Sequence, residues 1–322
     1  MNNLVFNLFL ISIFVSYLIV YLTLPKLTNF IVDKPNSRSS HKIPKPTSGG
    51  ISFVFSSIII TFTLGNFLPL ICLPLALVGF IDDLFSLKNK VRYLVQVLTS
   101  ILLIKQSSLS TIYLIDQNFG INLLSYGLLI LFITGIINFV NFMDGIDGLV
   151  CSCSIIILSV AALSINSSLW IIVGSLIGFL FWNWSPSKIF MGDIGSTFIG
   201  AIIAGNLLEI NNSFESLNIL FVASPLLADA FLCVLRRLFA MQPIFNAHSL
   251  HLYQRLYQAG WDHSKITIQY LIATLFIAIC SLLNSVIFTF SSFVVVLFYG
   301  FYLDRKFAIP FNESLRNANI NK

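Results

Sequence analysis

Long runs of apolar residues, separated by short polar connections, dominate the pattern of this chain. A helix needs about 20 apolar residues to cross a bilayer, and most of the runs approach that length. The pattern predicts eleven transmembrane helices, with ten as the alternative, because three runs are short and Pro69 and Pro74 interrupt one of them. The expected spans are 4–24, 49–67, 68–81, 92–106, 121–140, 149–166, 168–184, 195–210, 216–237, 265–284 and 286–303.

The composition supports this interpretation. Hydrophobic residues make up 57% of the 322 residues and charged residues only 10%, whereas soluble domains carry about 25% charged residues. We therefore predict an all-α, polytopic integral membrane protein with one domain over residues 1–322. The chain enters its first apolar run directly after Met1-Asn2-Asn3, without a basic region or a cleavage site. This favours a retained helix over a signal peptide.

The basic residues indicate an orientation. Of the 18 Lys and Arg, 17 lie in one set of connections, in their immediate flanks or in the tail from residue 304, and Lys105 is the exception. The positive-inside rule places these loops in the cytoplasm, the N-terminus outside and the C-terminus inside. Most of the carboxylates and all the histidines fall on the same side, so we expect a cytoplasmic active site. The expected cytoplasmic loops are about 25–48, 82–91, 141–148, 185–194 and 238–264.

One polar stretch between two apolar runs carries Asn138, Asn141, Asp144 and Asp147. A spacing of three places these side chains roughly on one face of a helix end. Carboxylates and amides at a membrane edge are costly without a partner. A polar cap between two helices is the simpler alternative, but a cap does not need four regularly spaced acceptors. The stretch therefore predicts a site for a cation and a ligand rich in hydroxyl or amide groups.

Two adjacent carboxylates, Asp82 and Asp83, end the short third run. Neighbouring residues cannot share one helix face, so we expect one to orient or act as a base and the other to contact a metal or a basic partner. Adjacent like charges raise the pKa of at least one carboxyl group, which suits a base. The alternative is a helix end solvated by nearby basic residues. Acidic residues at a helix C-terminus oppose the macrodipole, which weighs against it.

Two further loops carry candidate ligand contacts. Asn183, Phe190 and Asp193 surround the point where the chain re-enters the membrane, and an aromatic ring beside an amide and a carboxylate suits a nucleobase. Asp193 as a helix cap is the alternative. In the first loop, Lys42 and Lys45 precede two glycines that would let the backbone approach an anion. An ordinary positive-inside loop explains the same lysines.

The last loop contains His248, His251 and Arg255, which would share one face of a helix. His-x-x-His suggests zinc, but no third soft ligand is expected near, and the five cysteines suit structural or neutral roles. Contact with phosphate is the preferred interpretation. Asp229 lies inside the ninth apolar run and should have a partner or face a cavity.

Taken together, these motifs resemble the polyprenyl-phosphate N-acetylhexosamine-1-phosphate transferases. This integral-membrane family, glycosyltransferase family 4, includes WecA and MraY. The similar motifs span residues 33–260, most of the chain. They are Gly49-Gly50, Phe80-Ile81-Asp82-Asp83, Asn138-x-x-Asn141-x-x-Asp144-Gly145-Ile146-Asp147-Gly148, Asn183-x-x-Pro186, Phe190-Met191-Gly192-Asp193-x-Gly195-Ser196 and the loop with His248 and His251.

The resemblance implies a reaction. N-acetylhexosamine 1-phosphate would pass from a UDP-N-acetylhexosamine to undecaprenyl phosphate, releasing UMP. This would be the first membrane step of cell-surface glycan synthesis, at the bacterial inner membrane. Carboxylate and amide ligands suit Mg²⁺, with Mn²⁺ as the alternative cofactor.

The resemblance also implies roles for individual residues. By analogy with the family, Asp193 and Asn141 would hold the metal, and Asp82 would act as the base with Asp83 in support. The substrate-binding residues would be Asn138, with Asp144, Asp147, Asn183 and Phe190 around the uridine, Lys42 or Lys45 at phosphate, and His248, His251 and Arg255 at the diphosphate and sugar.

One departure concerns the sugar. WecA-like members usually show His-x-His-His in the last loop, whereas this loop is similar to the branch that starts O-antigen chains with 6-deoxy-N-acetylhexosamines. A phospho-N-acetylmuramoyl-pentapeptide transferase is the alternative within the family. A lipid or sugar transporter is the rival class, although transporters place ionisable groups near the midplane. A non-catalytic scaffold would not need so dense a cluster. We expect no nucleic-acid partner, and a homodimer is the assembly to test.

Overall fold

The computed structural model describes residues 2–35, 39–41, 43–108, 119–209, 213–243, 248–283 and 285–320 of the chain. Over these residues the fold is almost entirely helical. Its single sheet pairs β1 (Val32–Asp33) with β2 (Lys45–Pro46) in antiparallel register. The prediction of an all-α polytopic membrane protein is therefore confirmed.

Each predicted apolar run coincides with helical structure. The third run forms two helices, α3 (Leu68–Ile71) and α4 (Leu73–Phe85), which meet at Cys72. Each has a proline in its first turn, where a missing N–H costs nothing. The other runs form α1 (Asn3–Phe30), α2 (Ile51–Phe62), α5 (Asn89–Gln106), α7 (Phe119–Met143), α8 (Leu149–Ser164), α9 (Leu169–Asn183), α10 (Gly192–Leu207), α11 (Ser213–Phe239), α13 (His263–Ser281) and α14 (Val286–Lys306).

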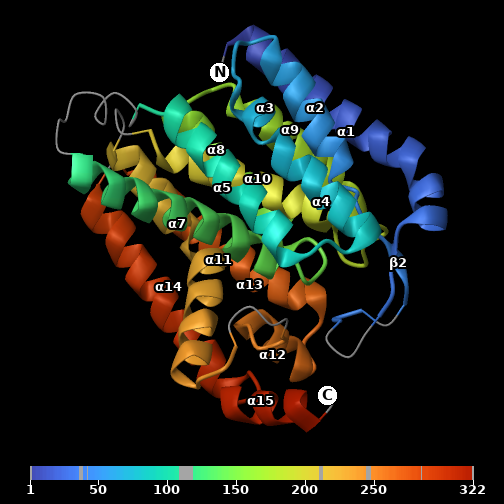
Figure 1. Cartoon of the computed structure of the whole chain (residues 1–322), viewed down its shortest axis with the longest axis vertical. Coiled ribbons are helices and arrows are strands. Elements are labelled where there is room, and N and C mark those ends of the chain that lie inside the picture. Colours follow the sequence, from blue (N-terminus) through green and yellow to red (C-terminus); the bar gives the residue numbers. More distant parts are fainter. Residues whose placement is uncertain are drawn as a thin grey trace.

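Two helices lie in segments that were expected to be loop or tail. These are α12 (Leu252–Gln258) and α15 (Phe311–Ile320). A helix of 7 residues such as α12 shows only about two turns of periodicity, too little for a pattern to predict it. Both lie at the lower end of the molecule in Figure 1, together with the C-terminus, while the N-terminus lies at the upper end.

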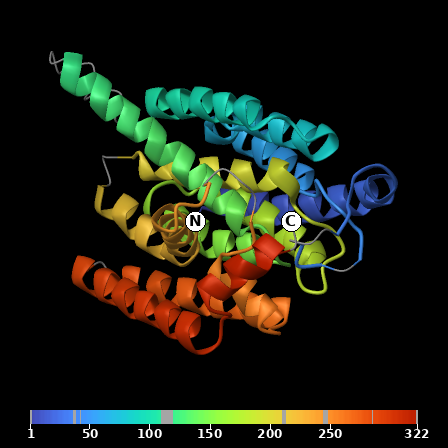
Figure 2. The same ribbon diagram turned by 60° about the horizontal axis from the view of Figure 1, so that its bottom comes forward.

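The helices are arranged around a buried centre. Every residue of α10 from Ile194 to Asn206 is buried, and α8 and α9 are also largely enclosed. Helices α1 and α2 pack against α9, α4 and α7 pack against α10, and α11 and α13 pack against α8. Figure 2, with the lower end turned forward, shows α13 and α14 on one side of this centre and α5 on the other.

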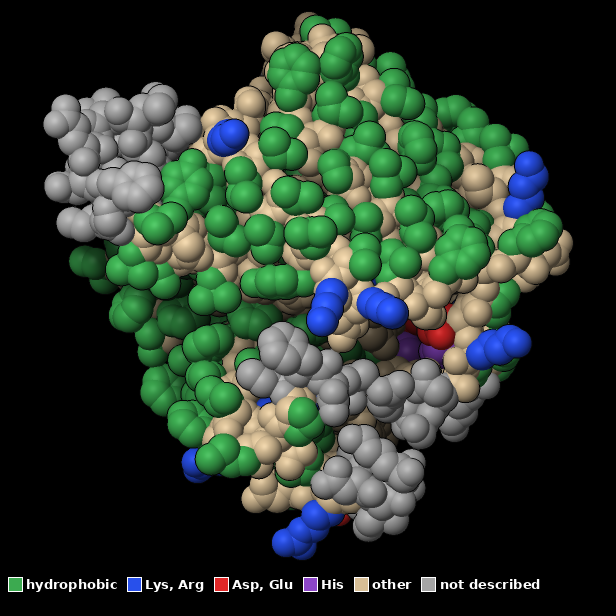
Figure 3. Space-filling model, viewed as in Figure 1, with side chains coloured by type: hydrophobic (Ala, Val, Ile, Leu, Met, Phe, Trp, Pro, Cys, Tyr) green, Lys and Arg blue, Asp and Glu red, His purple; other side chains and the backbone are tan. Residues whose placement is uncertain are grey.

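The outer faces of the bundle are apolar. Phe14 of α1 is 64% exposed, Leu131 of α7 is 61% exposed and Ile287 of α14 is 75% exposed. Figure 3 shows hydrophobic side chains over most of one face, with a hollow below two basic side chains where acidic and histidine side chains are visible. Because α1, α7, α11, α13 and α14 each contain a stretch long and apolar enough to cross a bilayer, these faces suit contact with lipid. The number of crossing helices stays a prediction.

Candidate active site

Two glycines allow the ends of α2, α4 and α10 to meet. A Cβ atom on Gly79 would lie 2.5 Å from backbone atoms of Asp193, and one on Gly50 would lie 2.6 Å from Cα of Gly195. Side-chain carbons do not approach backbone atoms so closely, so only glycine allows this packing. As a result, the last turn of α4, with its two carboxylates, lies directly against the first turn of α10.

Asp83 caps α10 from outside that helix. Its Oδ1 accepts a hydrogen bond of 2.9 Å from the backbone N–H of Asp193, and its Oδ2 accepts one of 2.6 Å from Oγ of Ser48. A carboxylate at a helix N-terminus satisfies a backbone donor that has no partner within the helix and is favoured by the helix dipole. Asp83 therefore joins α4, α10 and the start of α2.

Arg92 bridges two of the carboxylates. Its Nη1 lies 2.8 Å from Oδ2 of Asp82, and its Nη2 lies 2.6 Å from Oδ2 of Asp193. Oδ1 of Asp82 also accepts a hydrogen bond of 2.6 Å from the backbone N–H of Leu87. The turn between α4 and α5 thus brings the guanidinium of Arg92 back beside Asp82, which precedes the turn.

Asn141, in the last turn of α7, contacts Asp193. Its Nδ2 donates to Oδ1 of Asp193 and to Oγ of Ser196, each at 2.8 Å. Among the described residues no donor pairs with its carbonyl oxygen. The amide is therefore oriented by α10, and its oxygen remains able to bind a cation.

Asp144 follows α7 and has no side-chain hydrogen bond within the described part of the chain. Burial, followed by the negative charges of Asp193, Asp83 and Asp147, raises the pKa of its carboxyl group well above the usual value. Close like charges are unfavourable unless a proton or a cation compensates them.

We call Asp82, Asp83, Asp144 and Asp193, with Arg92, the carboxylate cluster. Four acidic groups and one guanidinium leave an excess of negative charge at one rim of the bundle unless protons or a cation compensate it. The oxygen ligands available here, together with the free oxygen of Asn141, are the hard ligands that Mg²⁺ prefers. The residues present therefore fit a divalent cation of this kind.

A second group of contacts lies in the loops next to the cluster. Nζ of Lys45 donates to Oγ of Ser187 at 2.9 Å and lies 3.3 Å from Oδ1 of Asp147. The same ammonium lies 5.1 Å from the ring centroid of Phe190, close enough for a cation–π interaction. We call Lys45, Asp147, Ser187 and Phe190 the Lys45 group.

Asp147 is the anchor of this group. It accepts hydrogen bonds from the N–H of Ser187 at 3.0 Å and from its Oγ at 2.7 Å, and Nδ1 of His263 lies 3.3 Å away. Burial alone would raise the pKa of Asp147, but the contacts with His263 and Ser187 lower it well below its usual value. Asp147 is therefore ionised at neutral pH and holds Lys45 in place.

The side chains of two predicted substrate contacts, Asn183 and Asn138, form hydrogen bonds with other parts of the chain. Nδ2 of Asn183 donates to the carbonyl of Ile189 at 2.9 Å, and its Oδ1 accepts from the N–H of Gly148 at 3.2 Å. Asn138 exchanges hydrogen bonds of 2.9 and 3.0 Å with Gln96. Asn183 thus joins two loops of the site, and Asn138 joins α7 to α5. Their roles as substrate contacts stay predictions.

The last loop and the start of α12 lie next to the last turn of α7. Oη of Tyr253 donates to the carbonyl of Phe142 at 3.0 Å, and the rings of His251 and Phe142 lie 6.0 Å apart. Asp229 holds the start of α12, because it accepts hydrogen bonds from the N–H of Leu252 at 2.7 Å and from Oη of Tyr270 at 2.7 Å. The expectation that Asp229 has a partner is confirmed.

Arg255 does not reach the carboxylate cluster. Its guanidinium is buried, with Nε 3.1 Å from the carbonyl of Leu250, Nη1 2.9 Å from that of Ile309, and Nη2 paired with Asp304. These contacts join α12 to α14 and to the segment before α15. Contact of Arg255 with substrate stays a prediction, as it does for His248 and His251.

The expectation that no third soft ligand lies near the two histidines is wrong. Sγ of Cys233 in α11 and one nitrogen from each of His248 and His251 lie within 4.8 Å of one another. The sequence separates the cysteine from the loop by more than ten residues, so spacing alone could not reveal the contact. Lys42, the other predicted phosphate contact, lies outside the described residues.

Several site residues were not predicted as such, namely Ser48, Arg92, Ser187, Ser196 and His263. Only Arg92 left a usable signal, because a short connection between two helices returns the chain close to Asp82. The alternative in which nearby basic residues solvate the end of the third run is confirmed for this residue, because Arg92 contacts Asp82. The others act through tertiary contacts.

Comparison with known proteins gives a consistent result. The family described as "Glycosyl transferase family 4" matches residues 48–211, which contain the whole carboxylate cluster. A probable undecaprenyl-phosphate N-acetylglucosaminyl 1-phosphate transferase of Bacillus subtilis is 29% identical over 320 residues and covers 89% of each chain. An undecaprenyl-phosphate alpha-N-acetylglucosaminyl 1-phosphate transferase of Thermotoga maritima is 31% identical over 71% of this chain and 75% of the relative. A phospho-N-acetylmuramoyl-pentapeptide-transferase of Prochlorococcus marinus is 31% identical over 85% of each chain.

Proposed function

The chain belongs to glycosyl transferase family 4, and on this premise we propose that it transfers N-acetylhexosamine 1-phosphate from a UDP-sugar to undecaprenyl phosphate, with release of UMP. The names of two relatives specify an undecaprenyl-phosphate acceptor and an N-acetylglucosaminyl 1-phosphate group. The observation that carries the proposal is the carboxylate cluster, in which four acidic groups lie close together beside an apolar bundle and one guanidinium pairs with two of them.

The position of the cluster suits two substrates of opposite solubility. A lipid phosphate must remain in the bilayer while a nucleotide sugar arrives from water, so the reaction has to take place at the membrane surface. The cluster lies at the ends of α4, α7 and α10, and the outer faces of the bundle are apolar. The basic loops favour a cytoplasmic site with the N-terminus outside and the C-terminus inside.

A divalent cation, Mg²⁺ or alternatively Mn²⁺, would be held by Asp193 and the carbonyl oxygen of Asn141, with Asp144 beside them. When bound, such a cation neutralises the negative charge of a diphosphate and orients it. Asn141 contributes twice, because its amide nitrogen fixes the carboxylate of Asp193 while its oxygen stays available. Arg92 compensates the negative charge of Asp193 and of the neighbouring Asp82.

The Lys45 group would receive the nucleotide. The ring of Phe190 offers a face on which a uracil base can stack, and Lys45 lies near that ring with its ammonium fixed by Asp147 and Ser187. An ammonium held in this way can contact the phosphates without a large loss of side-chain entropy. Asn183 supports this arrangement by joining the two loops that carry Asp147 and Phe190.

In the transfer step, an oxygen of the lipid phosphate attacks the phosphorus that carries the sugar. The bond from that phosphorus to the oxygen bridging it to UMP breaks, and UMP leaves with the electron pair. Asp82 would accept the proton of a lipid phosphate that is still protonated. Arg92, which lies beside Asp82, would hold the negatively charged lipid phosphate there. Asp83 keeps α10 and Asp193 in position. Catalysis of phosphoryl transfer rests mainly on positioning and charge neutralisation.

Release of UMP tests the proposal directly. The purified protein is incubated with Mg²⁺, undecaprenyl phosphate and, separately, UDP-GlcNAc, UDP-GalNAc, a UDP-6-deoxy-N-acetylhexosamine and UDP-N-acetylmuramoyl-pentapeptide. We expect UMP with one of the simple N-acetylhexosamine donors, and none without undecaprenyl phosphate or after addition of EDTA. Absence of UMP with every donor would overturn the enzymatic function.

The same assay distinguishes two alternative functions. UMP from the pentapeptide donor alone would assign the chain to peptidoglycan synthesis, which the name of the Prochlorococcus relative favours. A transporter would move lipid or sugar between vesicle compartments without releasing UMP. The fold weighs against this function, because both carboxylate oxygens of Asp229 within α11 already accept hydrogen bonds from α12 or from Tyr270.

A further inference from the structure

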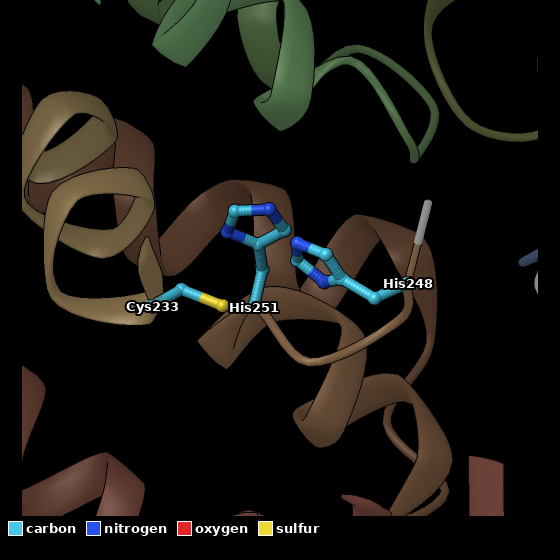
Figure 4. Close-up of side chains that lie close together, drawn as sticks. All are labelled: Cys233, His248 and His251. Atoms are coloured by element: carbon cyan, nitrogen blue, oxygen red, sulfur yellow. The ribbon is translucent and has the colours of Figure 1, made fainter. Parts of the chain in front are cut away.

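A second group of ligating side chains lies outside the carboxylate cluster, where α11 passes the loop before α12. Cys233 comes from α11, and His248 and His251 come from the loop. One ligand atom of each side chain lies within 4.8 Å of the other two. Figure 4 shows the two imidazole rings next to one another, with the sulfur of Cys233 pointing toward His251.

The group is enclosed, and one of its polar atoms has no partner. Cys233 is 4% exposed and His251 is 2% exposed. Nδ1 of His251 is buried and makes no hydrogen bond within the described part of the chain. Buried ring nitrogens are almost always paired in folded proteins, so Nδ1 needs a partner, and the neighbouring carboxylate of Asp229 can supply it while Nε2 stays available to a ligand.

The rings of His248 and His251 lie next to one another, as two ligands of a single ion must. The ring centroids lie 4.9 Å apart. A neutral imidazole keeps a lone pair for a metal and does not repel it.

The surroundings contain the partner that orients a metal-bound imidazole. Oδ1 of Asp229 lies 3.9 Å from Nδ1 of His251. Metal-bound histidines commonly donate their other ring N–H to a carboxylate. If His251 ligates through Nε2, a small rotation lets its Nδ1–H donate to Asp229, which removes the unpaired nitrogen. Asp229 is itself fixed by the N–H of Leu252 and Oη of Tyr270.

We propose that Cys233, His248 and His251 form a Zn²⁺ site whose fourth position is open to water or another ligand. One thiolate and two imidazoles are a ligand set that suits zinc, in contrast to the oxygen ligands of the carboxylate cluster. Binding releases the proton of the Cys233 thiol to solvent. Zinc–ligand bonds of about 2.0–2.3 Å place tetrahedral ligand atoms about 3.3–3.6 Å apart, so side-chain rotations of roughly an ångström close the site.

Zinc at this site would tie the loop before α12 to α11, one turn beyond the point where Asp229 already holds α12. The loop leads to Tyr253, which contacts the last turn of α7. The inference is independent of the proposed transferase activity, because metal binding can be measured without substrate.

The test uses the full purified chain, stripped with a chelator and titrated with Co²⁺ or Zn²⁺. We expect one high-affinity equivalent per chain, with Co²⁺ showing a thiolate charge-transfer band and the intense visible bands of a tetrahedral site. Cys233→Ser should abolish the charge-transfer band and weaken binding by about tenfold or more. Cys280→Ser, which changes a cysteine in α13 outside the group, should bind like the unmodified chain.

The proposal would be overturned if the charge-transfer band persisted in Cys233→Ser, or if the unmodified chain bound no high-affinity equivalent of metal. If Cys233→Ser does not fold, X-ray absorption of the zinc-loaded unmodified chain decides the question. We expect one sulfur neighbour at about 2.3 Å and nitrogen neighbours at about 2.0–2.1 Å. A spectrum with oxygen and nitrogen neighbours alone would contradict the proposal.

Discussion

Nη2 of Arg92 lies 2.6 Å from Oδ2 of Asp193, although the two residues are far apart in the sequence and belong to different helices. The same guanidinium contacts Asp82, so a single basic side chain compensates carboxylates from α4 and α10. Arg92 therefore supplies positive charge that offsets the repulsion between these carboxylates, and a bound divalent metal would supply it as well.

Replacing Arg92 with alanine should destabilise the metal-free protein by about 1–2 kcal/mol, because two charge-assisted hydrogen bonds are lost and the remaining carboxylates repel one another. Millimolar Mg²⁺ should restore more stability in the variant than in the unmodified chain. Thermal unfolding in detergent, with and without Mg²⁺, measures both effects. Lys90→Ala removes an exposed positive charge nearby and should change neither value. Equal effects of Mg²⁺ on both proteins would refute the idea that Arg92 and the cation share this role.

Asp193→Ala should abolish UMP release. Loss of a residue that supports a metal ligand costs about 10–100-fold in affinity or activity, and loss of a ligand itself should cost more. Asp33→Ala, which removes an exposed carboxylate of β1, is the matched control and should retain activity. Initial rates at several Mg²⁺ concentrations provide the measurement. Retention of full activity by Asp193→Ala would remove Asp193 from the metal site.

Lys45→Ala should weaken binding of the UDP-sugar more than it slows the chemical step. Its ammonium is held beside Phe190 and would contact the nucleotide in both the ground state and the transition state, which is uniform binding. We expect KM to rise by about tenfold, equivalent to about 1.4 kcal/mol. Lys34→Ala, which changes an exposed lysine of the same loop, should leave KM unchanged. A large fall in kcat at unchanged KM would place Lys45 in the chemistry instead.

The lowered pKa of Asp147 predicts a pH dependence of stability. Because this pKa is lower in the folded than in the unfolded chain, Asp147 contributes stability above about pH 4, the usual pKa of an unfolded aspartate. That contribution decreases as the pH falls below this value toward the folded pKa.

Asp147→Asn should therefore lower the unfolding temperature at pH 7, and its difference from the unmodified chain should shrink below about pH 4. Unfolding temperatures recorded between pH 3 and pH 7 measure this difference. Ser187→Ala, which removes one hydrogen bond to Asp147, should show a smaller change of the same sign. A difference that stays constant over the whole pH range would contradict the assignment.

Gly79→Ala should disturb the site without changing any polar group. The new Cβ would lie 2.5 Å from backbone atoms of Asp193, so α4 and α10 must separate and the hydrogen bond from Asp193 N–H to Asp83 lengthens. Overpacking of this kind costs about 1–3 kcal/mol, and UMP release should fall as well. Gly127→Ala in α7 adds a Cβ with no atom within 4 Å and should be neutral or slightly stabilising. Equal behaviour of the two variants would show that the close approach is not required.

The positions of the helices could be predicted because apolar length is a local property. Each run near the length of a membrane span became a helix, and Pro69 and Pro74 correctly marked the break that separates α3 from α4. The same reasoning missed α12 and α15, because neither is long enough or apolar enough to be distinguished from a loop.

The candidate site was predictable in part. Polar side chains at membrane edges are costly without partners, which singled out Asp83, Asn141 and Asp193, and the structure brings Asp83 and Asn141 each into direct contact with Asp193. Asn138 and Asn183 were selected by the same reasoning, yet their amides join helices and loops within the fold. A polar residue at a membrane edge needs a partner, but the sequence does not say whether that partner is a ligand or another part of the chain.

The sequence by itself therefore determined the helical membrane fold, the rim at which polar groups gather and the family motifs, because these depend on neighbouring residues and their hydrophobicity. Only the tertiary structure decided which groups face one another. Arg92 reaches Asp193 because α5 returns beside α4, and Cys233 meets His248 and His251 because α11 passes the loop before α12. Such contacts depend on how distant helices pack, and no local pattern of residues specifies that packing.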